Sequence, residues 1–184
     1  MLFRSIAANV PGVVIDWIVE APFAALPALH PAVRNVIPIA WRKWRKSLGK
    51  PETRAAFKAA RVAIAKEHYD LVLDLQGLVK SALWATQANG PRAGYDWASA
   101  REPLASLFYK KRAAVDKTLH AVERSRRLAA AHLRYEIAGK AKFSLKAPDA
   151  AWTPQGERYA VLITGASRPE KLWPEASWQA VAQA

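Results

Sequence analysis

Cysteine is absent from the 184-residue chain, and histidine is scarce. Without cysteine the chain can form neither a disulfide framework nor a thiolate metal site, which fits a reducing cytoplasm. The four histidines are scattered without the spacing of metal ligands, at His30, His68, His120 and His132. We therefore expect no metal site at these side chains, and we also expect no bound cofactor.

Long apolar runs are also missing. No stretch is long enough to cross a bilayer as a helix. The run from Ile6 to Ile15 follows Arg4, as in a secretory signal, but Pro11 interrupts it and no small-residue cleavage site follows. The sequence thus predicts neither a membrane-spanning segment nor a signal peptide.

Acidic residues are few. Fifteen Asp and Glu stand against 28 Lys and Arg, which gives a net charge of +13 and a pI near 10.3. Such an excess bears on partners rather than on the fold. It leaves three classes of partner open, namely nucleic acid, an anionic membrane surface and a phosphorylated substrate.

The chain does contain a regular alternation of strand-like and helix-like segments. Its 52% of hydrophobic residues is typical of a globular protein. Short apolar runs predict strands at residues 13–19, 35–39, 70–76, 92–97 and 159–165. Helical periodicity and turn signals predict helices at 21–30, 52–68, 77–88, 99–114, 120–135 and from 174 onward, while residues 1–9 look like the tail of a helix. This alternation predicts an α/β fold with a parallel sheet covered on both faces.

A polar, proline-containing stretch at residues 136–157 predicts a linker. We therefore expect one domain over residues 1–150 and the start of a second over 151–184. Both ends look cut, because the last helix lacks a stop signal and no first strand with a nucleotide loop precedes the strand at 13–19.

The segment Trp41–Lys46 combines tryptophan with cations and follows a predicted strand, which places it in a loop at the strand's carboxyl end. Four of its six residues are cationic, Arg42 and Lys46 among them. A guanidinium group binds a phosphate or carboxylate through two parallel hydrogen bonds, and a lysine adds a point charge. Its tryptophans could stack on a sugar or base, lie at a membrane interface, or pack in the core. The segment is either an anion site or a solvated basic loop; a second basic cluster lies at residues 110–112.

Two strand-to-helix junctions have the composition of anion sites. Gln76 and Gly77 make the turn after one strand, and Lys80 lies one turn into the next helix. The stretch 164–174 joins a strand end to a helix start and carries Ser167 and Lys171. Neither has the glycine pattern of a Walker or dinucleotide motif. An ordinary turn beside a solvated lysine remains open at both junctions.

Together these segments resemble the heptosyltransferases of glycosyltransferase family 9, which use ADP-heptose. The resemblance covers nearly the whole chain after Asn9. It is carried by residues 36–46, Tyr69–Ser81, Asp96–Tyr109, His120–Arg124 and 164–174. The run from Asp96 to Tyr109 is long and the most specific of these.

The resemblance implies a GT-B fold with two facing Rossmann-like domains. This chain would hold an incomplete N-terminal acceptor domain, without its first strand, and the first strand and helix of the donor domain. It further implies inverting transfer of heptose from ADP-heptose to the 3-deoxy-manno-octulosonic acid (Kdo) of Kdo-lipid A. No metal is required by that scheme.

The resemblance also assigns residues. Lys171, with Ser167 beside it, would bind the donor diphosphate, although Ala166 stands where the family often has a second hydroxyl. No residue matches the general base, which the resemblance places upstream of Met1, so the fragment by itself is expected to be inactive. The predicted acceptor-binding set has six members: Arg42, Lys46, Gln76, Lys80, Arg101 and Arg124.

The expected partners are ADP-heptose, Kdo-lipid A and an anionic membrane surface, with the protein peripheral on the cytoplasmic face of the inner membrane. The alternatives are a basic nucleic-acid-binding module and a membrane binder without catalysis. Nucleic acid is not expected, because the basic residues lie on no recognised nucleic-acid fold.

Overall fold

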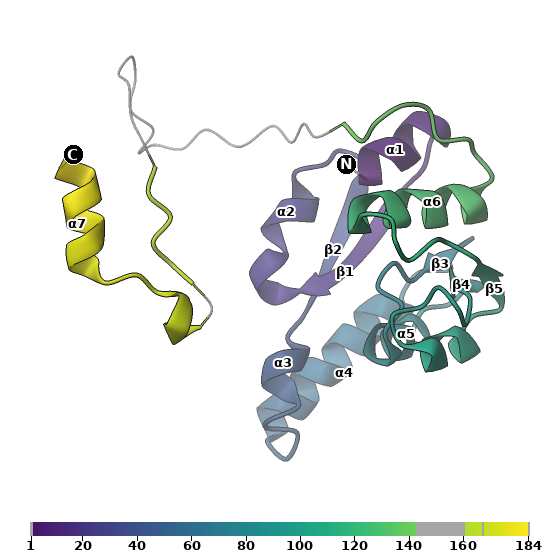
Figure 1. The fold of residues 1–184 in the computed structure, drawn as a ribbon. Coiled ribbons are helices and arrows are strands. Elements are labelled where there is room, and N and C mark those ends of the chain that lie inside the picture. The colour runs from purple at the N-terminus through teal and green to yellow at the C-terminus, as the bar shows by residue number, and fades with distance from the viewer. Residues whose placement is uncertain (1, 143–160, 167, 184) are drawn as a thin grey trace. The chain divides into compact units, whose positions relative to one another are not determined.

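The computed structural model describes residues 2–142, 161–166 and 168–183 (Figure 1). The chain divides into two compact units, residues 1–147 and 148–184. The strands of the first unit are β1 (Ile15–Glu20), β2 (Val33–Ile39), β3 (Val72–Leu73), β4 (Arg92–Tyr95) and β5 (Lys111–Ala113). Its helices are α1 (Leu2–Asn9), η1 (Ala21–Phe23), α2 (Ala25–Ala28), α3 (Trp41–Trp44), α4 (Pro51–Ala65), α5 (Val79–Ala85), η2 (Pro103–Phe108) and α6 (Ala121–Leu133).

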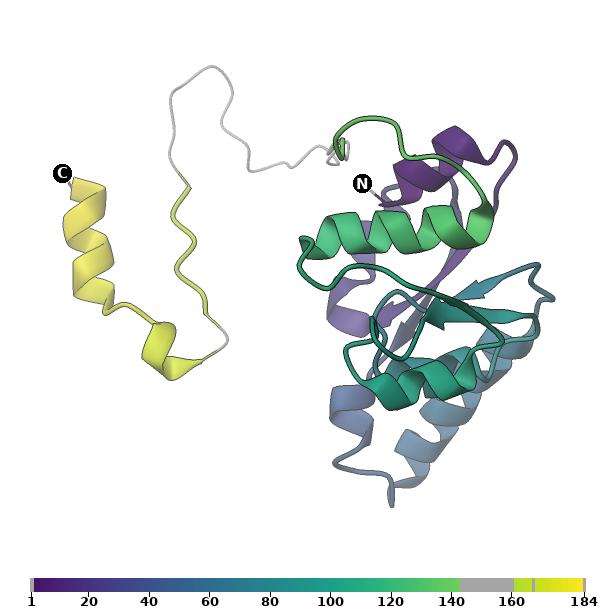
Figure 2. The same cartoon turned by 45° about the vertical axis from the view of Figure 1, so that its right-hand side comes forward.

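All the paired strands run parallel. β1 pairs with β2 in one sheet, and β3, β4 and β5 form a second sheet in that order. Helices cover both faces of the second sheet, with α6 on one face and α5 beside η2 on the other (Figure 2). The predicted α/β fold with parallel strands is therefore confirmed.

Helix α4 shows how the sequence sets an element. Pro51 occupies the first turn, where its missing N–H costs nothing, and Glu52 lies close to the positive end of the helix dipole. Ala60 and Ile64, four residues apart, are buried against the first sheet. The predicted helix at 52–68 is confirmed, apart from its last turn.

The basic and aromatic segment is a short helix, α3, and not the loop that the sequence predicts. Trp44 is buried and packs against Phe57 and Trp84, with ring centroids 6.0 Å and 6.1 Å apart. Trp41 also contacts Trp84, edge to face at 6.5 Å. Burial of Trp44 draws one side of the segment into the core and leaves Arg42 and Lys46 exposed.

The single helix expected at 99–114 is wrong. The structure has the 3₁₀ helix η2, followed by the edge strand β5. Two side chains compete with helical hydrogen bonds here, because Asp96 Oδ1 accepts the Ser99 N–H at 2.7 Å and Ser99 Oγ accepts the Val115 N–H at 2.8 Å. Pairing of Lys111–Ala113 with β4 then overrides helix propensity.

In the second unit, η3 (Pro169–Lys171) precedes α7 (Glu175–Gln183), which confirms the helix predicted from 174 onward. The strand predicted at 159–165 is not found over residues 161–165; residues 159 and 160 lie outside the described part. A strand needs a hydrogen-bonded neighbour, and the described residues of this unit offer none. Residues 136–142 of the predicted linker carry no helix or strand, and the rest of the linker is not described.

Candidate active site

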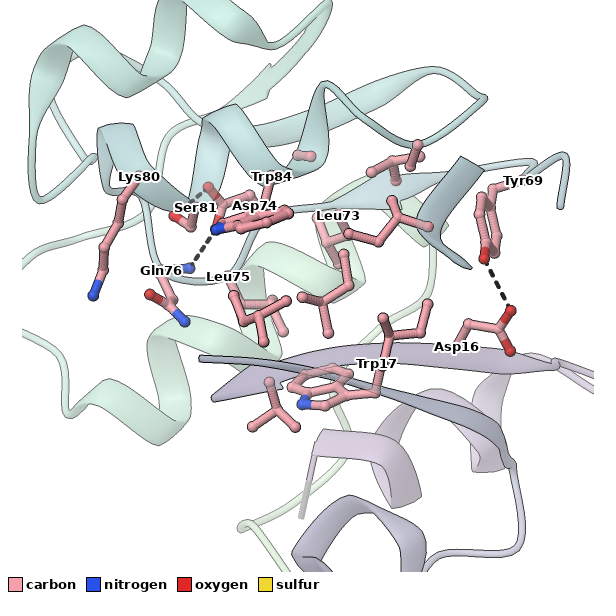
Figure 3. Close-up of a pocket in the computed structure, with 18 of the residues that line it drawn as sticks. Asp16, Trp17, Tyr69, Leu73, Asp74, Leu75, Gln76, Lys80, Ser81 and Trp84 are labelled. Atoms are coloured by element: carbon pink, nitrogen blue, oxygen red, sulfur yellow. Dashed lines mark hydrogen bonds between the residues drawn. The ribbon is translucent and has the colours of Figure 1, made fainter. Parts of the chain in front are cut away.

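A cavity of about 190 Å³ lies between the two sheets (Figure 3). Its walls are mostly apolar, as at Trp17, Ile37 and Leu73. Polar side chains gather at two ends, with Asp16 and Tyr69 at one and the turn between β3 and α5 at the other. The facing edges of β1 and β3 have no strand partner among the described residues.

The carboxyl ends of two strands open on this cavity. Trp41, which follows β2, lines it together with Gln76 and Lys80, which follow β3. Ligands of parallel α/β sheets bind at this place. The structure thus brings Gln76 and Lys80, two of the predicted acceptor residues, to one wall of the cavity.

Asp74 organises the turn that presents them. Its Oδ1 accepts the N–H of Gln76 at 2.8 Å and that of Gly77 at 3.4 Å. Its Oδ2 accepts the hydroxyls of Ser81 and Tyr109, each at 2.6 Å. Asp74 is only 6% exposed, so these donors replace the water that its carboxylate loses on burial. Burial and the Asp74 charge raise the pKa of Tyr109, so its hydroxyl stays protonated and donating.

Gly77 draws a second segment against this turn. Its φ of 64° lies in the left-handed region, and an added Cβ would lie 3.0 Å from the Tyr95 ring and 3.3 Å from the backbone nitrogen of Arg101. Glu102 donates its N–H to the Gly77 carbonyl at 2.9 Å and accepts the Val79 N–H on its carboxylate at 2.7 Å. The backbone of Arg101 is therefore fixed beside the turn that carries Gln76.

Arg124 approaches the same segment from α6. Its guanidinium stacks 4.9 Å from the centre of the Tyr95 ring and donates to the Ser99 carbonyl at 2.6 Å. Its Nε is buried and has no hydrogen-bond acceptor within the described part of the chain. Four predicted acceptor residues, Gln76, Lys80, Arg101 and Arg124, thus stand on adjoining segments.

The remaining predicted residues are less closely tied to the cavity. Arg42 and Lys46 are exposed on and just after α3, which reaches the cavity through Trp41. Lys171 is exposed at the end of η3, and Ser167 lies outside the described residues. Their roles stay predictions.

The opposite end of the cavity is closed by Asp16, whose side chain is 4% exposed. Its carboxylate accepts two hydrogen bonds from Arg34, from Nε at 3.0 Å and from Nη2 at 2.7 Å. It also accepts hydrogen bonds from the Tyr69 hydroxyl at 2.9 Å and from Asn35 Nδ2 at 3.2 Å. The pKa of Asp16 is lowered, mainly by its hydrogen bonds from Arg34. The pKa of Tyr69 is raised to about 12, first by burial and then by its hydrogen bond to Asp16. Because all these groups are engaged, this end acts as a clasp between β1, β2 and the segment before β3.

Sequence reasoning missed three residues that shape the site: Asp74, Glu102 and Tyr109. The sequence does carry a signal for Asp74. Aspartate side chains often accept hydrogen bonds from the backbone N–H groups two and three residues further on in a turn, which here are those of Gln76 and Gly77. No local sequence pattern predicts the hydrogen bond between Tyr109 and Asp74, which are 35 residues apart.

In residues 2–142, 161–166 and 168–183 no group of three or more His, Asp or Glu side chains is arranged to hold a metal ion. Over the same ranges, no helix combines the length and apolar character needed to cross a membrane.

Comparison with known proteins identifies the family. The model of glycosyltransferase family 9 (heptosyltransferase) matches residues 58–184. Lipopolysaccharide heptosyltransferase 1 of Escherichia coli strain K12 is 44% identical over 178 residues, covering 92% of this chain and 54% of that protein. The chain belongs to glycosyltransferase family 9. Lipopolysaccharide heptosyltransferase 1 of Pseudomonas aeruginosa PAO1 is 42% identical over 180 residues, covering 96% of this chain and 50% of that relative.

Solved structures of this family agree in fold. The E. coli heptosyltransferase WaaC with ADP-2-deoxy-2-fluoro heptose superposes with a TM-score of 0.84 at 40% identity, over 99% of this chain and 59% of that one. WaaC with ADP gives a TM-score of 0.82 at 38% identity, over 99% and 58%. The GT-B class that the resemblance implies is confirmed. The chain spans about half the length of the curated relatives it matches.

Proposed function

We propose that this chain forms the acceptor-binding part of a heptosyltransferase together with the start of its donor-binding domain. The enzyme would transfer L-glycero-D-manno-heptose from ADP-heptose to Kdo of Kdo-lipid A during assembly of the lipopolysaccharide inner core. The observation that carries the proposal is the wall of the cavity, where cationic and amide side chains meet at strand ends in a family 9 chain. An acceptor bearing carboxylates and phosphates suits such a wall.

The reaction is a displacement with inversion. An acceptor oxygen forms a bond to the anomeric carbon of heptose, the bond from that carbon to the diphosphate breaks, and ADP leaves. A base takes the proton of the acceptor hydroxyl. We assign no residue of this chain as that base, because the carboxylates of Asp16, Asp74 and Asp96 already accept hydrogen bonds from neighbouring groups.

Binding falls to two sets of residues. We propose that Arg42, Lys46 and Arg101 hold acidic groups of the acceptor, with Gln76, Lys80 and Arg124 beside them. Lys171 and Ser167 would stabilise the negative charge of the departing diphosphate. The protein would work at the cytoplasmic face of the inner membrane, in contact with its anionic surface.

A chimaera tests the proposal, with this chain replacing the matched region of E. coli lipopolysaccharide heptosyltransferase 1. In it, Arg42→Ala with Arg101→Ala should raise KM for the acceptor roughly a hundredfold or more, because each of the two lost charge-assisted contacts contributes about 1.5–3 kcal/mol net of water. KM for ADP-heptose should stay nearly unchanged.

The matched control removes the same charge elsewhere. Lys58→Ala with Lys66→Ala takes two exposed cations from α4 and its carboxyl end and should leave both KM values unchanged. An acceptor KM that is equal in the Arg42/Arg101 variant and the parent chimaera would refute the acceptor assignment.

A further inference from the structure

The outer face of η2 is apolar. Leu104 and Leu107 expose 57% and 61% of their surface. They are three residues apart in a 3₁₀ helix, which has three residues per turn, so they lie on the same side. The inner side is buried, where Ala105 and Tyr109 pack with Ala82 of α5. Two leucines therefore face solvent on a helix that is already anchored to the fold.

Cations gather at the carboxyl end of the same helix. Arg92 Nε donates to the Phe108 carbonyl at 3.0 Å, and Arg112 Nε donates to the Tyr109 carbonyl at 3.2 Å. These bonds hold one guanidinium group at the last carbonyl of η2 and another at the carbonyl of the next residue. Two exposed lysines, Lys110 and Lys111, lie between Tyr109 and Arg112 in the chain.

This positive charge is not neutralised locally. None of the ion pairs within the described part of the chain involves Arg92, Arg112 or the two lysines. We call the two leucines and the four cations that adjoin η2 the η2 patch: Leu104, Leu107, Arg92, Lys110, Lys111 and Arg112.

The chemistry of the η2 patch fits an anionic lipid bilayer. Surfaces that rest on membranes insert leucine into the acyl boundary and set lysine and arginine against lipid phosphates. Protein interfaces, by contrast, are depleted of lysine, and single-stranded nucleic acid is bound by stacking on aromatic rings. We propose that the η2 patch docks the protein on an anionic membrane. The proposal rests on the proposed function, which gives the enzyme a lipid-linked acceptor.

The η2 patch is joined to the site by one helix. Helix α5 carries Lys80 at the cavity and Ala82 against η2, and the two helices lie side by side (Figure 1). Docking at η2 would hold the acceptor wall close to the lipid surface, where the sugar of a lipid-linked acceptor is found.

The test uses the 184-residue chain and co-sedimentation with phosphatidylcholine vesicles, with and without phosphatidylglycerol, at low ionic strength. The chain should bind the anionic vesicles far more tightly than the neutral ones. Leu104→Ser with Leu107→Ser should weaken that binding about tenfold, since it removes two inserted side chains. Lys110→Gln with Lys111→Gln should weaken it about tenfold or more, because each cation near the surface contributes on the order of 1 kcal/mol.

The control variant removes a similar pattern from α4. Lys58, Val62 and Lys66 are spaced four residues apart and are exposed, so Lys58→Gln with Val62→Ser and Lys66→Gln deletes two cations and one apolar side chain elsewhere. It should bind like the parent chain. Equal loss in this control, no loss in the leucine variant, or equal binding to neutral vesicles would each overturn the proposal. So would binding of duplex DNA that depends on Lys110 and Lys111 when vesicle binding ignores the leucines.

Failure here can be told from failure of the proposed function. In the chimaera, the leucine variant should keep its turnover of acceptor presented in detergent micelles. Lost vesicle binding with kept turnover supports the η2 patch. Unchanged vesicle binding with an acceptor KM that depends on Arg42 and Arg101 overturns the patch alone.

Discussion

At the scale of single residues, the buried carboxylates of this chain hold structure in place. Asp16 and Asp74 each accept four hydrogen bonds, at opposite ends of one cavity. A buried charge is tolerated only when such donors surround it. The donors of Asp16 include a cation, Arg34, so its contribution to stability depends on pH.

Asp16→Asn should destabilise the chain at pH 7 by about 1.5–3 kcal/mol, the value of hydrogen bonds to a charged group. The pKa of Asp16 is lowered in the folded state, so its contribution is fully present above the ordinary aspartate pKa and is lost as pH falls through the folded pKa. Urea unfolding should therefore show a constant gap between wild type and variant from pH 8 to about 5 that shrinks at lower pH.

Asp70 supplies the matched control, because it is an exposed aspartate on the segment next to the clasp. Asp70→Asn should change the free energy of unfolding by no more than about 0.5 kcal/mol. A gap for Asp16→Asn that widens as pH falls would contradict the role of Arg34.

At the scale of elements, β4 carries the heaviest constraint. It is the central strand of its sheet, and Gly94 lets the Tyr109 ring cross it to reach Asp74. A Cβ on Gly94 would lie 2.4 Å from Tyr109 Cε2 and 2.6 Å from Cδ2. The ring has little room to move, because Tyr109 is 2% exposed and its hydroxyl is bound.

Gly94→Ala should therefore cost about 1–3 kcal/mol or more by overpacking and lower Tm by several degrees. Gly49→Ala is the control, since its Cβ would meet no atom within 4 Å. The measurement is thermal unfolding followed by circular dichroism. Equal Tm values for the two variants would show that the Tyr109 ring can yield.

The elements also show where sequence is informative. β1, β2, α4 and α7 follow from apolar runs, helical period and Pro51, because each depends on neighbours in the chain. β5 and η2 do not, because Lys111–Ala113 becomes a strand only through pairing with β4. The site divides in the same way. Gln76 and Lys80 line the cavity, as expected for residues that follow the carboxyl end of a parallel strand. The hydrogen bond from Tyr109 to Asp74 could not be predicted, because it joins residues far apart in the chain.

At the scale of the whole molecule, net charge and open strand edges have opposite effects on association between copies of the chain. β1 and β3 each present an edge whose backbone groups lack a strand partner among residues 2–142. Such edges are templates for pairing with other copies. The net charge of +13 keeps copies apart, but only over the Debye length, which falls from roughly 30 Å at 0.01 M salt to about 3 Å at 1 M.

The open edges consequently make colloidal stability a matter of ionic strength. The chain should remain monodisperse in dilute buffer, and light scattering should grow as salt is added beyond about 0.15 M, where screening is nearly complete within one molecular radius. Slower amide exchange in Ile15–Glu20 on association would identify the β1 edge as the point of self-contact. Scattering that is unaffected by salt would mean that the edges are sheltered without help from charge, so storage at low ionic strength would bring no benefit.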